Sequence, residues 1–96
     1  MSSYNSRNID GQPDDGADSL ALLRIAERLV EQLSFESPAL VPQGEIIRTE
    51  LGHSVQDGLP ANRGRIRFAL EAIATRVAAG SGSLVLVQEI ARALEV

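Results

Sequence analysis

The stretch that decides the fold is residues 62–79, NRGRIRFALEAIATRVAA. Its apolar residues recur with the spacing of one face of an α-helix, which predicts a helix over the whole stretch: Ile66, Ala69, Leu70, Ile73, Ala74 and Val77. Gly80 follows directly and can take the left-handed conformation that ends a helix. Because a helix with one apolar face is not stable alone, the remaining segments are expected to cover it.

A second apolar face runs along residues 18–34, DSLALLRIAERLVEQLS. It is broad enough to pack against two neighbouring helices, and its central row is Leu22, Ala26, Leu29 and Leu33. Asp18 or Ser19 is expected to cap this helix by accepting a hydrogen bond from a free backbone N–H. Residues 1–17 are mostly polar, so we expect them to form a disordered acidic arm.

Proline and glycine divide the middle of the chain. Pro38 and Pro42 each restrict the residue before them, which predicts a turn or a single helical turn. Residues 43–51 are then expected to form a short helix that ends at Gly52. Residues 52–61 hold two glycines and a proline and are expected to be a loop.

The last element is residues 84–94, with Ser83 as its expected cap. The run LVLV could form a strand, but the apolar stripe continues through EIARAL, so a helix is favoured. The predicted fold is therefore all-α: a small four-helix bundle with one short helix over residues 18–96, preceded by the arm of residues 1–17.

Composition disfavours several classes of function. The chain has 96 residues, no cysteine and a formal charge of −4. Without cysteine there is neither a disulfide framework nor a thiolate metal site, and the acidic charge disfavours binding to nucleic-acid phosphates. No apolar run approaches the ~20 residues of a membrane span. The start also lacks the basic and apolar regions of a signal peptide, so we expect a soluble cytoplasmic protein. All nine cations are arginine, as GC-rich codon usage produces, which indicates a bacterial origin.

Few side chains are candidates for catalysis or metal binding. His53 is the only histidine, and its expected place in a loop without an orienting partner indicates a surface residue. Glu45 and Glu50 are five residues apart, so they would point in different directions from a helix. A phosphate-binding loop with its lysine is impossible in a chain without lysine. The sequence therefore predicts no enzyme, no metal and no cofactor.

Arginine is concentrated at the start of the helix predicted over residues 62–79, at positions Arg63, Arg65 and Arg67. Cations are not favoured at this end of a helix dipole. One interpretation is a solvated face. The other is a patch that docks an acidic surface, either of a partner or of this chain's own Asp14, Asp15 and Asp18.

Two local resemblances suggest further functions. The residues Gly16-Ala17-Asp18-Ser19-Leu20 resemble the phosphopantetheine attachment motif of acyl carrier proteins, which would make Ser19 the residue that carries the cofactor arm. That family has a long helix well upstream of its serine, whereas eighteen mostly polar residues precede Ser19. A simple helix cap is the alternative for Asp18 and Ser19.

The second resemblance lies in residues 86–96, LVQEIARALEV, which are similar to the first helix of a helix-turn-helix unit. In that family a second helix enters the major groove, and the resemblance implies a fragment of a transcriptional regulator. Because the sequence stops at Val96 and the charge is acidic, we do not expect DNA binding.

The function favoured by these observations is a protein–protein interaction or adaptor module, with another protein or a second copy of the chain as its partner. Apolar residues make up 44% of this short chain, and surplus apolar area usually ends in an interface. The predicted docking surface is either the last helix or one face of the helix over residues 18–34. That face comprises Leu20, Leu22, Ile25 and Leu29. Arg63, Arg65 and Arg67 are predicted to contact the partner as well.

Overall fold

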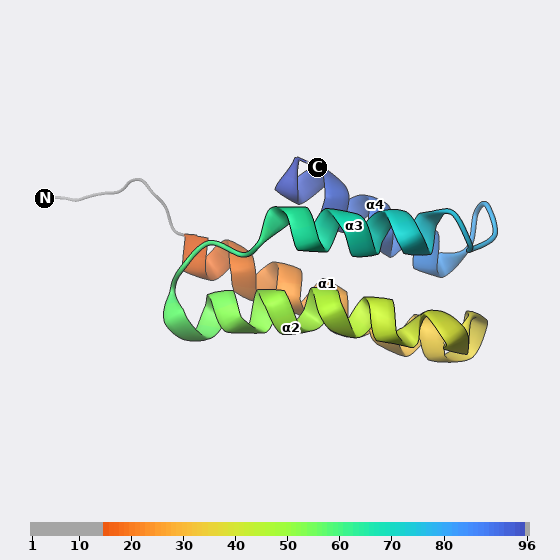
Figure 1. Ribbon diagram of the computed structural model, residues 1–96, viewed down its shortest axis with the longest axis horizontal. Helices are drawn as coiled ribbons and strands as arrows, with labels where there is room; N and C mark the ends of the chain where they lie inside the picture. Colours follow the sequence, from red (N-terminus) through yellow and green to blue (C-terminus); the bar gives the residue numbers. More distant parts are fainter. Residues whose placement is uncertain (1–14, 96) are drawn as a thin grey trace, which may run out of the picture.

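The computed structural model describes residues 15–95, with side chains from residue 19 onward. All regular secondary structure in this part of the chain is helical, and the predicted all-α bundle is confirmed. Its elements are α1 (Asp15–Glu36), the short 3-10 helix η1 (Pro38–Leu40), α2 (Val41–Asp57), α3 (Arg63–Ala74) and α4 (Gly82–Leu94). Consecutive helices run in alternating directions, and α4 returns to pack against α1, which closes the bundle (Figure 1).

The core between the four helices is entirely aliphatic. It contains Leu22, Ala26, Leu29 and Leu33 of α1, Ile47 and Leu51 of α2, Ile66, Ala69, Leu70 and Ile73 of α3, and Val87, Ile90 and Leu94 of α4, together with Leu40 of η1. The stripe that defines α3 is buried from Ile66 to Ile73, with α2 and α4 as its neighbours, whereas Ala74 at its end is exposed. Both phenylalanines of the chain remain on the surface.

Helix α1 begins earlier than its apolar pattern indicates. It starts at Asp15, so Asp18 and Ser19 lie inside the helix and neither is its cap. The expected arm therefore loses residues 15–17, and the rest of it, together with Asp14, lies outside the described residues. The helix ends at Glu36, and Ser37 precedes the helical turn that the two prolines predict.

Helix α2 is longer than the short helix predicted at residues 43–51. It begins at Val41, because Pro42 is tolerated in the first helical turn, where its missing N–H has no helical partner. It passes through Gly52 and ends at Asp57, and the following Gly58 has the left-handed φ of 75° that is typical of a helix stop. The helix continues because its inward row runs from Leu51 to Ser54, which is buried.

Helix α3 is shorter than predicted and ends at Ala74, five residues before the expected end. Thr75 and Val77 donate to backbone carbonyls in a closing turn, and the hydroxyl of Thr75 also donates to the Ala72 carbonyl. Val77 still packs against the core, but it does so from this turn. Gly80, the predicted stop, lies in the connection to α4 with a φ of 82°.

The run LVLV is helical, as predicted, but Ser83 is not the cap of α4. Ser81 occupies that position and accepts a hydrogen bond from the Leu84 amide at 3.2 Å. Ser83 is buried and bonds to the end of α1 instead: its backbone N–H and its hydroxyl both donate to Glu36 Oε1, at 3.2 and 2.7 Å. A carboxylate from α1 thus satisfies a free N–H in the first turn of α4.

The Glu36 contact makes the stability of the bundle depend on pH. Two hydrogen bonds lower the pKa of Glu36 from its ordinary value of 4.5. The one from Gln32 has the larger effect, and the one from Ser83 comes second. The contact therefore stabilises the fold above that value, and its contribution is lost as the pH falls through the lowered pKa. We expect Glu36→Gln to lower the melting temperature at pH 7 and to have a smaller effect at pH 3. Thermal unfolding followed by circular dichroism checks this.

Glu31→Gln is the matched control, because Glu31 lies on the exposed outer face of the same helix. Equal losses for Glu36→Gln at the two pH values would show that the ionised carboxylate contributes nothing.

Candidate functional site

The three arginines at the start of α3 do not form one patch. Asn62 caps the helix by accepting from the Arg65 amide at 3.1 Å. Arg63 and Arg67 are four residues apart and share one face of the helix, whereas Arg65 leaves the helix on another side. Arg65 Nε lies 3.4 Å from Glu50 Oε2 of α2, whereas Arg67 Nε lies 3.1 Å from Glu71 Oε2 on the α4 side of α3. The arginine patch expected from the sequence is therefore divided between two sides of the helix.

The predicted apolar face of α1 is largely buried. Leu22 and Leu29 belong to the core, with 8% and 0% of their surface exposed, and Ile25 is half-buried. Leu20 alone is substantially exposed, at 42%. The expectation of one exposed face is thus wrong for Leu22 and Leu29, because α2 and α4 both pack against α1. The alternative location, on the last helix, agrees better with the structure.

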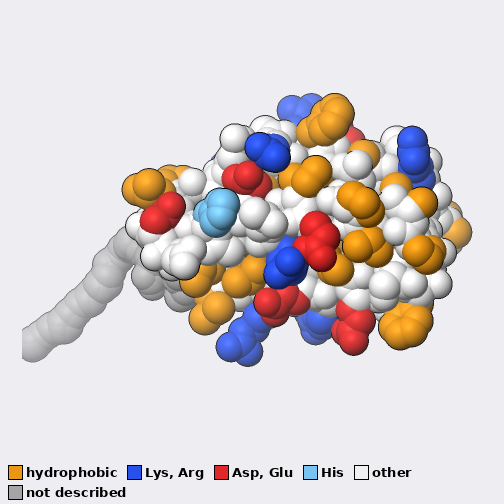
Figure 2. Space-filling view, turned by 60° about the horizontal axis from the view of Figure 1, so that its bottom comes forward, with side chains coloured by type: hydrophobic (Ala, Val, Ile, Leu, Met, Phe, Trp, Pro, Cys, Tyr) orange, Lys and Arg blue, Asp and Glu red, His pale blue; other side chains and the backbone are white. Residues whose placement is uncertain are grey.

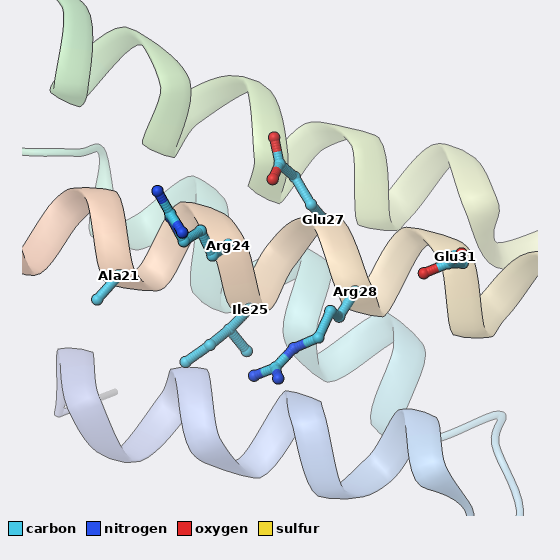
Figure 3. Close-up of a pocket in the computed structure, with 6 residues that line it drawn as sticks. All are labelled: Ala21, Arg24, Ile25, Glu27, Arg28 and Glu31. Atoms are coloured by element: carbon cyan, nitrogen blue, oxygen red, sulfur yellow. The ribbon is translucent and has the colours of Figure 1, made fainter.

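The outer face of α1 is a shallow hollow with mixed charge. Its lining comes from this helix alone: Ala21, Arg24, Ile25, Glu27, Arg28 and Glu31. Ile25 and Arg28 extend towards α4, and Glu27 extends towards α2 (Figure 3). Two cations alternate with two anions here, which is typical of a solvated face. The hollow offers neither a concentrated charge nor an apolar floor to a ligand.

An apolar groove runs between α3 and α4, which make sparser contacts than any other pair of neighbouring helices in the ring. Its floor is formed by the buried residues Leu70 and Val87, with a volume of about 210 Å³. Leu84 and Ala91 of α4 and the exposed Ala74 of α3 form its walls, and its rim carries Arg67, Glu71 and Gln88. The groove is thus an open apolar depression with a polar edge.

Phe68 stands on the exposed face of α3, beside Arg67, with 72% of its surface exposed. An aromatic side chain with this exposure is a common anchor of protein interfaces. The sequence contained its signal, because Phe68 falls on the opposite side of the helix from Ile66, Leu70 and Ile73. The groove itself had no signal in the sequence, because it depends on how α4 packs beside α3.

Ser19 lies at one end of the bundle, in the second turn of α1. Its hydroxyl is 3.1 Å from that of Ser54, which donates in turn to the Leu59 carbonyl. An adjacent hollow is lined by Ser19, Leu22, Leu51, Pro60, Ala61, Arg63, Ala93 and Leu94. Ser19 is therefore half-buried and hydrogen-bonded inside a helix, whereas the acyl-carrier resemblance implies a modified serine on the surface.

The polar residues that could take part in catalysis are separated from one another. His53 lies on α2 and not in the expected loop, and its side chain is exposed (Figure 2). Glu45 pairs with Arg48, and Glu50 pairs with Arg65. In residues 15–95 no group of three or more histidine or acidic side chains could hold a metal ion, and no helix is long and apolar enough to cross a membrane.

A second apolar surface lies at the corner where α1 joins α2, towards which hydrophobic side chains gather in Figure 2. Phe35 is 79% exposed there, and Pro38, Ala39 and Pro42 are exposed beside it. This corner is convex, whereas the α3–α4 groove is concave.

Comparison with protein families, with curated proteins and with solved structures found no match for this chain. A proposal for the function therefore depends on the surface of the described residues.

Proposed function

We propose that this chain is a non-enzymatic protein–protein interaction module that binds its partner through the groove between α3 and α4. The observation that carries the proposal is the groove's composition: an apolar floor and small side chains, bordered by a charged and polar rim. This is the arrangement of a typical interface, with an apolar centre and a polar rim. Of the site residues predicted from the sequence, Arg67 belongs to this surface.

The groove is suited to side chains rather than to a small-molecule ligand. Its volume of about 210 Å³ is below the ~300–1,000 Å³ of typical small-molecule pockets. Ala74 and Ala91 are small, so the backbone of a docking segment can approach closely, as in the binding of helices to grooves. The expected occupant is one or two large apolar side chains on a helix.

A photo-crosslinking experiment tests this surface on the full chain. A photoreactive phenylalanine analogue is placed at Gln88, on the groove rim, or at Gln56, which is exposed on α2. In cells that express the chain, we expect discrete protein adducts from position 88 and none from position 56.

Blocking the groove adds a second arm to this experiment. Ala74→Arg places a long charged side chain in the groove without altering a core residue, and we expect it to abolish the adducts from position 88. Ala21→Arg makes the same change on the exposed face of α1 and is expected to leave them intact. Adducts from position 88 that persist in Ala74→Arg would contradict the proposal.

A further inference from the structure

The exposed face of α3 carries a pattern that is symmetrical about the level of Ala69. Arg67 and Glu71 lie two residues before and after it, and Gly64 and Ala74 lie five residues before and after it. The spacings of three, four and three residues place these four side chains on one face, and all four are exposed. A helix with this pattern is complementary to an antiparallel copy of itself.

We propose that the groove is occupied by a second copy of this chain, in a two-fold dimer whose axis passes α3 at the level of Ala69. This inference rests on the proposed function and names the partner. In such a dimer, residues equally far before and after Ala69 face each other across the axis. Arg67 of each copy then faces Glu71 of the other, and Gly64 faces Ala74, so opposite charges meet and the backbones can approach.

The same axis brings Phe68 to the border of the contact. On α3 the groove is lined by Arg67, Leu70, Glu71 and Ala74, so its centre lies between residues 70 and 71. The position opposite this centre, across an axis at Ala69, lies between residues 67 and 68. Phe68 of the second copy is therefore level with the groove, but it leaves α3 on the side away from Leu70, so its 72% exposed side chain lies at the border of the contact and not on the groove floor.

An antiparallel arrangement also separates like charges. The start of α3 carries Arg63, Arg65 and Arg67, and a parallel pair would bring six arginines together. In the proposed dimer, Arg63 of one copy is level with position 75 of the other. The two Arg63 residues are therefore twelve residues apart along the α3 helix axis, about 18 Å at 1.5 Å per residue. Each arginine-rich start then faces the carbonyl end of the other α3, where the helix dipole is negative.

The interface is small, because it consists of one short helix and one groove from each copy. Interfaces below about 1,200 Å² are typical of weak, transient association. We therefore expect a dissociation constant of about 10–100 μM, which a concentration series by sedimentation velocity can measure.

Charge reversal provides the decisive test. Arg67→Glu and Glu71→Arg each place like charges across the axis, so each variant alone is expected to associate at least about tenfold more weakly than the native chain. A 1:1 mixture of the two variants places opposite charges across the axis again and is expected to restore association as a heterodimer. Arg28→Glu and Glu31→Arg make the same changes on α1 and are expected to alter nothing, alone or mixed.

Phe68→Ala provides a test that does not depend on charge. Because Phe68 is largely exposed, its loss leaves the core intact, and we expect association to weaken at least about tenfold. Phe35→Ala removes a phenylalanine that is 79% exposed on α1 and is expected to leave association unchanged. Circular dichroism of every variant confirms that the helices remain folded.

Three results would overturn the second copy as the occupant. The first is that the native chain stays monomeric at all concentrations up to about 1 mM. The second is that Arg67→Glu or Glu71→Arg alone associates as tightly as the native chain. The third is that the 1:1 mixture of these two variants fails to associate. Crosslinks from position 88 to other proteins that Ala74→Arg abolishes would then keep the groove as a docking surface. A monomer without such crosslinks would overturn the proposed function as well.

Discussion

Leu29→Ala is expected to lower the free energy of unfolding by about 3 kcal/mol, more than any substitution on the surface of the bundle. Leu29 lies in the middle of α1, and none of its surface is exposed. Truncation removes its buried methyl groups from the core and leaves a cavity that the surrounding aliphatic side chains fill only in part. Because a bundle of about 80 residues has only about 5–10 kcal/mol of stability, this is a large share.

Urea unfolding followed by far-ultraviolet circular dichroism measures this loss as a lower midpoint with an unchanged slope. Leu20→Ala is the matched control, because it makes the same chemical change on the same helix at a side chain that is 42% exposed. We expect a loss of below about 1 kcal/mol for Leu20→Ala. Equal losses would mean that α1 does not present Leu29 to the core.

This prediction limits how the apolar face of α1 can be studied. A charge at Leu22 or Leu29 would be buried without a partner and would unfold the bundle, so a loss of binding there would not identify a docking surface. Leu20, Phe68 and Ala74 are exposed, and their substitution separates binding from folding.

Gly44→Val is expected to lower the free energy of unfolding by about 2 kcal/mol. Gly44 is buried where α2 crosses α1, and a Cβ atom there would lie 3.0 Å from Leu33 Cδ1 and 3.2 Å from Val30 Cγ2. A branched side chain must push the two helices apart or force a core side chain out of its rotamer. The close approach of α1 and α2 therefore depends on glycine at this position.

Gly52→Val provides the comparison within the same helix. Apart from its chain neighbours and the backbone of its own helix, no atom lies within 4 Å of a Cβ built at Gly52. The substitution therefore costs no packing between helices, and the free energy of unfolding is expected to change by less than about 0.5 kcal/mol. Chemical unfolding of both variants measures the difference. Valine has a better helix propensity than glycine, so a loss at Gly52 as large as that at Gly44 would contradict the α1–α2 contact as the cause of the effect.

The contrast between Gly52 and Gly58 shows why the ends of helices are difficult to predict from the sequence. Gly52 and Gly58 are equally able to stop a helix, but only Gly58 has a positive φ. The choice depends on Ser54, a polar residue that is buried because it bonds to Ser19 and to the Leu59 carbonyl. A buried serine has no apolar signal, so the continuation of α2 could not be predicted from periodicity.

The candidate site was predicted only in part, for a similar reason. Spacing places the three arginines close together in the sequence, but Arg65 pairs with Glu50 of α2, whereas Arg67 pairs with Glu71 of its own helix. Phe68 could have been singled out as an aromatic residue on a polar face. The α3–α4 groove could not, because its two walls come from separate helices.

The sequence by itself determined that this protein is an all-α bundle with an aliphatic core. A 3.6-residue apolar period is a local property, and it is sufficient to define α3 and the inward faces of the other helices. The tertiary structure alone decided where the helices end, which leucines of α1 are buried and which apolar surface stays open. These features depend on contacts between residues far apart in the chain, such as Glu36 with Ser83, and packing energy there exceeds local preference.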